Sequence, residues 1–121
     1  MTNLAAFAAH QGVRHFLFSF SDLFGVQRAK LVPASAAAEL AACGAGFAGF
    51  AAWLEMTPAD ADVLARPDPA SLTQLPWQPE VAWVATDLAV GGVPLEQSPR
   101  LVLQRQLERA AAKGLHLRTG V

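Results

Sequence analysis

The sequence lacks several features that mark large protein classes. It has one cysteine, Cys43, in 121 residues, which excludes an internal disulfide and indicates a reducing compartment. No apolar run reaches the roughly 18 residues that a membrane span needs. Residues 4–9 are too short for the apolar part of a secretory signal, and no Lys or Arg precedes them. The hydrophobic fraction of 53% is high, but alanine inflates it.

An excess of charge is also missing. Nine Lys and Arg residues against ten Asp and Glu give a formal net charge of −1, so there is no basic field for nucleic acid or anionic lipid. The three histidines (His10, His15 and His116) have no metal-ligand spacing, and no glycine-rich loop ends in Lys-Ser or Lys-Thr. We therefore expect a cytoplasmic protein that contacts neither nucleic acid nor membrane, with no metal site of its own.

The first half of the chain has clear local signals. Asn3 or Thr2 caps a predicted helix that Gly12 ends. Residues 14–20 alternate as a strand with three phenylalanines on one face. A turn at residues 22–25 and a strand at 26–32 complete a hairpin, and a helix is expected at 34–42. Glycine-rich residues 44–52 predict a loop or irregular strand with close backbone approaches.

The second half begins with a segment, residues 56–79, whose five prolines predict a rigid, extended surface loop. A continuous apolar run at 81–88 predicts a central strand. A Gly-Gly turn follows, and residues 93–95 are expected to form a short strand that runs back along it. Ser98 and Pro99 open a helix that Gly114 ends, with an apolar stripe formed by Leu103, Leu107 and Ala110. Residues 115–121 are expected to begin a further strand. These elements predict an α+β fold with a β-grasp-like sheet and packed helices.

Four further side chains have predicted roles. Cys43 is expected to be a small buried residue at a helix end. We expect Trp83 in the core and Trp77 as an anchor of the proline-rich loop. Packing is favoured for Trp53, although an aromatic side chain there could also contact a partner or ligand.

Three motifs in fixed order carry a resemblance to a known family. They are Ser19-Phe20-Ser21-Asp22-Leu23-Phe24-Gly25, then Pro67-Asp68-Pro69 with Pro76-Trp77, then Ser98-Pro99-Arg100. With this spacing the chain resembles the amino-terminal β-grasp domain of the glutamine synthetase family. The sequence of residues 44–51 resembles the branch of that family labelled type III. The resemblance implies an N-terminal helical segment at 1–12, the β-grasp domain at 13–113 and the start of a truncated catalytic domain at 114–121.

The resemblance also implies a chemistry. Family members are carbon–nitrogen ligases of glutamine biosynthesis that use ATP and Mg²⁺ or Mn²⁺ to join ammonia to glutamate. They assemble as homo-oligomeric rings in which this domain completes the active site of the neighbouring subunit. The family's metal-binding glutamates begin within the truncated last strand. We therefore assign no catalytic and no metal-binding residue to this chain, expect no cofactor in it, and expect it to be inactive alone.

The family's loop in trans is usually Phe-Asp-Gly-Ser, whose Asp helps to bind ammonium. The matching substrate-proximal residues here are Phe47, Ala48 and Gly49, with Trp53 following. Ala48 cannot hold ammonium, so the parent protein could be a glutamine synthetase or a γ-glutamyl ligase that uses an organic amine. A free-standing, non-enzymatic β-grasp interaction module is the third reading.

Overall fold

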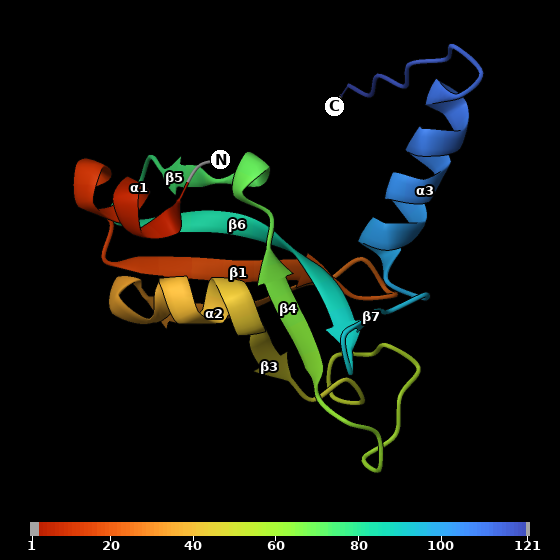
Figure 1. Ribbon diagram of the computed structural model, residues 1–121, viewed down its shortest axis with the longest axis horizontal. Helices are drawn as coiled ribbons and strands as arrows, with labels where there is room; N and C mark the ends of the chain where they lie inside the picture. The colour runs from red at the N-terminus through yellow and green to blue at the C-terminus, as the bar shows by residue number, and fades with distance from the viewer. Residues whose placement is uncertain (1–2, 121) are drawn as a thin grey trace.

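The aromatic-rich segment near the start of the chain forms a central strand of the fold (Figure 1). The computed structural model describes residues 3–120. Its elements follow in this order: α1 (Leu4–Gln11), β1 (His15–Ser21), β2 (Gln27–Pro33), the 3-10 turn η1 (Ala34–Ala36), α2 (Ala37–Cys43), β3 (Ala45–Phe47), β4 (Val63–Pro67), the 3-10 turn η2 (Pro69–Ser71), β5 (Thr73–Leu75), β6 (Gln78–Val90), β7 (Val93–Pro94) and α3 (Pro99–Ala111).

One mixed sheet contains all the strands. Its main order is β2-β1-β6-β4-β3, and β5 and β7 pair with the long strand β6. β1 and β6 run parallel, whereas the other pairs are antiparallel. The two parallel central strands are β1 and β6. β1 continues into the β1–β2 hairpin, and the connection from β2 to β6 contains α2. This arrangement is the β-grasp-like topology that the sequence predicted. The α+β class is confirmed.

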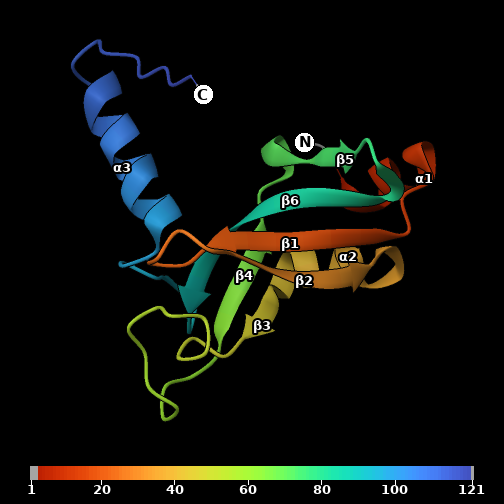
Figure 2. The same cartoon turned by 180° about the vertical axis from the view of Figure 1, so that it is seen from behind.

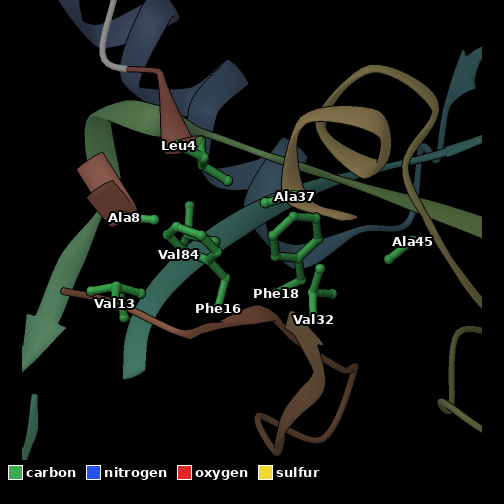
Figure 3. Packing of buried hydrophobic residues seen from close by; sticks show 10 residues of the cluster. Leu4, Ala8, Val13, Phe16, Phe18, Val32, Ala37, Ala45 and Val84 are labelled. Atoms are coloured by element: carbon green, nitrogen blue, oxygen red, sulfur yellow. The ribbon is translucent and has the colours of Figure 1, made fainter. Parts of the chain in front are cut away.

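The main core lies between this sheet and the helices α1 and α2. Phe16 and Phe18 are completely buried, and Figure 3 shows them together with Leu4 of α1, Ala37 of α2 and Val84 of β6. Burial of each aromatic side chain contributes roughly 1.5–3 kcal/mol. The predicted alternation of β1 is therefore confirmed, because its phenylalanines face one side.

A second apolar cluster lies under the long loop between β3 and β4. Its buried members come from that loop and from β1, β4, β6 and the segment before α3: Phe20, Ala52, Leu54, Val63, Ala65, Leu88 and Leu95. In Figure 2 the loop extends below the end of the sheet where β3, β4 and β6 meet. This cluster fixes the loop to the sheet.

Several local predictions are confirmed. Asn3 caps α1 by accepting the Ala5 amide at 2.8 Å, and Gly12 ends the helix in the left-handed region with φ +70°. Thr2, the alternative cap, lies outside the described residues. The Gly91-Gly92 turn has φ +57° and +84° and joins β6 to β7. Both results depend on side-chain and backbone preferences within a few residues.

The prediction of a surface loop at 56–79 is wrong. This segment contains β4 and β5, and Val63 and Ala65 of β4 are completely buried between β3 and β6. The prolines do not interrupt the pairing because Pro67 is the last residue of β4 and Pro69 opens η2. Proline density thus marks the ends of short elements here.

Helix α3 also differs from expectation. It points away from the sheet in Figures 1 and 2, and none of its residues is buried. Leu103 and Leu107 of the predicted apolar stripe are 53% and 39% exposed. Ser98 occupies the N-cap position, but its side chain makes no capping bond.

Residues 115–120 form no strand, because no described strand lies beside them to pair with. Val121 lies outside the described residues.

Three other side-chain predictions are wrong. Cys43 is exposed, because α2 turns this position away from the sheet. Trp77 is 78% exposed, so it is not a buried anchor of the proline-rich segment. Trp83 is half-buried, because it lies on the sheet face away from the main core and lines a hollow with Pro99 and Leu103.

Candidate functional site

The turn between β1 and β2 is built around one buried carboxylate. Asp22 is 1% exposed. Its Oδ1 accepts the backbone amides of Phe24 and Val26, both at 2.9 Å. Its Oδ2 accepts Nε and Nη2 of Arg28 at 2.9 and 2.8 Å. Four donors therefore satisfy this carboxylate, and the turn that it stabilises leaves the Phe24 side chain 74% exposed.

These bonds also set the ionisation of Asp22. Burial would raise its pKa, but hydrogen bonds from Val26, Arg28 and Phe24, with the charge of Arg28, outweigh burial and hold the pKa below the ordinary value of 3.8. The carboxylate is therefore ionised at neutral pH and serves the architecture of the turn.

The loop after β3 alternates between buried and displayed residues. Ala52 and Leu54 are 5% and 0% exposed, whereas the side chain between them, Trp53, is 58% exposed. Trp53 and Glu55 both have left-handed backbones, with φ +52° and +54°. Such conformations are rare for residues other than glycine and cost about 1–2 kcal/mol each. The buried anchors thus hold two strained residues that face outward.

The turn and the loop meet in an exposed apolar depression, which we call the aromatic hollow. The rings of Phe24 and Trp53 pack edge to face with centroids 5.5 Å apart. The Leu23 amide donates a long bond of 3.5 Å to the Trp53 carbonyl. The hollow has a volume of about 350 Å³ and is lined by Leu23, Phe24, Phe50, Trp53, Glu55 and Met56. One carboxylate therefore lies among exposed apolar and aromatic side chains.

Phe47 and Ala48 line a separate hollow of about 230 Å³, which also contains Arg28. The Phe47 ring packs edge to face on Phe20 at 4.9 Å, and Lys30 lies over it with Nζ 4.9 Å from the ring centroid. Lys30 Nζ also donates to the carbonyl of Gly46. The ring of Phe47 is thus already paired with a cation of this chain.

The structure therefore divides the residues singled out from sequence. Phe47 and Ala48 share one hollow, whereas Trp53 lies in the other. Gly49 is buried, and a Cβ there would lie 2.2 Å from Sδ of Met56 and 3.0 Å from Cγ2 of Val63. Its lack of a side chain allows the loop to approach β4.

Of the six residues that line the aromatic hollow, only Trp53 was among the candidate site residues predicted from the sequence. Phe24 was noted only as part of a turn motif, and nothing local signals that this turn contacts Trp53. Glu55 has no motif around it. A positive φ at a residue other than glycine cannot be recognised from the sequence, so its outward display was not predictable.

An ion-pair cluster joins two of the three sequence motifs. Arg100, at the start of α3, pairs with Asp68 of the Pro-Asp-Pro motif and, through Nε at 2.9 Å, with Asp87 of β6. Gln104 donates to the same Asp87 oxygen at 3.2 Å. These contacts fix the first turn of α3 to the sheet.

Residues 3–120 contain no group of three or more His, Cys, Asp or Glu side chains arranged to hold a metal ion. None of the helices described is long and apolar enough to cross a membrane.

Comparisons with known proteins identify the relatives of this chain. No family model matches it. It is 54% identical over 119 residues to a glutamine synthetase of Rhizobium leguminosarum bv. phaseoli, covering 98% of this chain and 27% of that protein. It is 41% identical over 117 residues to a glutamate–methylamine ligase of Methyloversatilis universalis, covering 95% and 26%. A solved structure of GmaS with ADP superposes with a TM-score of 0.90 at 60% identity, covering 93% and 26%. The chain spans about a quarter of the length of each of these proteins.

Proposed function

Because the chain belongs to the glutamine synthetase family, we propose that it is the amino-terminal domain of an ATP-dependent ligase that joins an amine to glutamate. The observation that carries this proposal is the match of 98% of the chain, at 54% identity, to about a quarter of a glutamine synthetase. The fold supports it, since the structure superposes on a GmaS structure with a TM-score of 0.90.

The proposal divides the chain into a helical segment at 1–12, the β-grasp domain at 13–113 and the start of the catalytic domain at 114–121. The substrate-proximal segment contains Phe47, Ala48, Gly49 and Trp53. It completes the active site of a neighbouring subunit in a homo-oligomeric ring. Its exposed apolar side chains support this role, because such patches on a soluble domain mark contact surfaces.

The part of this domain in the reaction is to exclude water. An activated glutamyl intermediate must meet the amine before it meets water, so the site needs an apolar cover. The loop residues 48–56 provide that cover, held in place by Leu54 and by Gln97, whose Nε2 donates to the Leu54 carbonyl at 2.9 Å. ATP and a divalent metal ion would bind in the catalytic domain and supply the phosphoryl transfer.

Two acceptors fit this proposal, ammonia and an organic amine. A glutamine synthetase relative at 54% identity supports the first. A glutamate–methylamine ligase at 41% identity supports the second, as does Ala48, whose methyl group offers no charge or hydrogen bond to ammonium.

The test is phosphate release by the full-length gene product with glutamate, ATP, Mg²⁺ and a panel of ammonia, methylamine, ethylamine and ethanolamine. Release that depends on glutamate and on an amine is the expected result. Absence of release with every amine, from a folded protein, would refute the ligase proposal and favour the non-enzymatic interaction module.

A further inference from the structure

We propose that the aromatic hollow binds the protonated form of an organic amine, an alkylammonium cation, and so selects the acceptor of the reaction. The inference rests on the proposed function for its biological meaning.

The hollow has the chemistry that recognises organic cations. The faces of Trp and Phe rings attract a cation, and alkyl groups on that cation gain from apolar contact. Phe24, Phe50 and Trp53 are 74%, 48% and 58% exposed, so their rings are accessible to a ligand. Glu55 adds a carboxylate for the ammonium charge. Free ammonium has no alkyl group, so this surface favours a substituted amine.

The electrostatic surroundings distinguish this hollow from others on the described surface. Its lining includes one carboxylate and no arginine or lysine. Four other hollows each include an arginine, which would repel a cation: Arg28, Arg100, Arg14 and Arg66. In the hollow beside Phe47, Arg28 is paired with the buried Asp22, and Lys30 already lies over the Phe47 ring.

The backbone presents these groups at a cost. Trp53 and Glu55 alternate with two buried anchors, and both adopt the left-handed conformation that side chains rarely accept. Strain of this kind clusters at ligand-binding sites, where the surrounding packing maintains it. Here the anchors Ala52 and Leu54 provide that packing, so the two displayed side chains are held facing the same hollow.

The binding test titrates the 121-residue chain with tetramethylammonium chloride, with sodium chloride at equal concentration as the control. The indole N–H resonances of the three tryptophans are followed by NMR, and each is assigned from a Trp→Phe variant. A saturable shift of the Trp53 signal, with Trp77 unaffected, is expected. The exposed Trp77 is the matched internal control. Glu55→Gln should weaken the shift. Equal responses of Trp53 and Trp77, or no response beyond that to sodium chloride, would overturn the inference.

The kinetic test uses the full-length gene product. Trp53→Leu and Glu55→Gln should lower the ratio of kcat/KM for methylamine to kcat/KM for ammonia by roughly 3- to 30-fold. Trp77→Leu should leave that ratio unchanged. An unchanged ratio in the Trp53 and Glu55 variants, including an equal loss with both acceptors, would overturn the inference.

The two tests separate the failure of the inference from the failure of the proposed function. Saturable cation binding by a full-length protein that is inactive with every amine would retain the site and refute the ligase. Ligase activity without cation binding at Trp53 would retain the enzyme and refute the site.

Discussion

The substitution Leu54→Ala tests whether a buried anchor holds the loop of residues 48–56 in place. Leu54 is completely buried and belongs to the second apolar cluster. Its backbone is also fixed, since its amide donates to the Gly49 carbonyl at 3.3 Å and its carbonyl accepts from Gln97. The loop therefore has limited freedom to close the space that a smaller side chain leaves.

The expected cost follows from the atoms removed. Leu→Ala deletes three carbons, and at about 0.8 kcal/mol for each buried carbon the loss of transfer free energy is about 2.4 kcal/mol. An unfilled cavity adds to this, and buried Leu→Ala substitutions cost about 2–5 kcal/mol in total. A loss of 2.4 kcal/mol corresponds to a fall in Tm of roughly 10 °C for a domain of this size.

The assay is urea-induced unfolding of the 121-residue chain, followed by circular dichroism and tryptophan fluorescence. The matched control is Leu103→Ala, the same chemical change on α3, where the side chain is 53% exposed. The control should change the free energy of unfolding by about 0.5 kcal/mol or less. A loss below about 1 kcal/mol at Leu54, or equal losses at both positions, would refute the anchoring argument.

Three further substitutions address other parts of the fold. Asp22→Asn should destabilise the chain at neutral pH. The difference in stability from the parent chain should shrink as the pH falls below 3.8, because a carboxyl with a lowered folded-state pKa stabilises the folded chain above its ordinary pKa and loses that effect on protonation. Urea unfolding midpoints at pH 7 and pH 3 measure this difference. Arg100→Gln should increase hydrogen exchange in the first turn of α3, while stability changes by only about 0–1 kcal/mol. Gly44→Ala should be more destabilising than Gly12→Ala in thermal unfolding, because both have positive φ but a Cβ at Gly44 would lie 2.9 Å from Cβ of Leu64.

Each of these has a clear contrary result. A constant difference between Asp22→Asn and the parent chain from pH 7 to pH 3 would show that the carboxylate charge does not stabilise the turn. Arg109→Gln at the far end of α3 is the control for Arg100→Gln, and equal exchange in both variants would exclude a role for the ion pairs. Equal losses at Gly44 and Gly12 would show that β4 moves to accept the added carbon.

Much of the local architecture could be predicted from the sequence. The alternation of Phe16 and Phe18, the turn at Asp22 and the caps at Asn3 and Gly12 each depend on preferences within a few residues. Those elements were therefore identified correctly. Strand β4 was not, because the prolines around it suggested a loop, and its identity depends on hydrogen bonds to β3 and β6, which are distant in sequence.

The candidate site shows the same division. Trp53 was predicted to be substrate-proximal from its position after a glycine-rich segment and from the family resemblance, and the sequence has Ala48 where the family usually has an Asp. The aromatic hollow could not be predicted from the sequence, because it forms only when the turn that carries Phe24 packs beside the loop that carries Trp53 and Glu55.

The sequence by itself thus determined the β1–β2 hairpin and the two ends of α1, because each depends on side-chain preferences within a few residues, and its short motifs indicated the family. Only the tertiary structure decided which side chains meet. It brought Phe24 to Trp53 and Arg100 to Asp68 across long stretches of chain, and it left α3 without a buried face. The physical reason is that local conformation depends on neighbouring residues, whereas a binding surface depends on how distant segments pack.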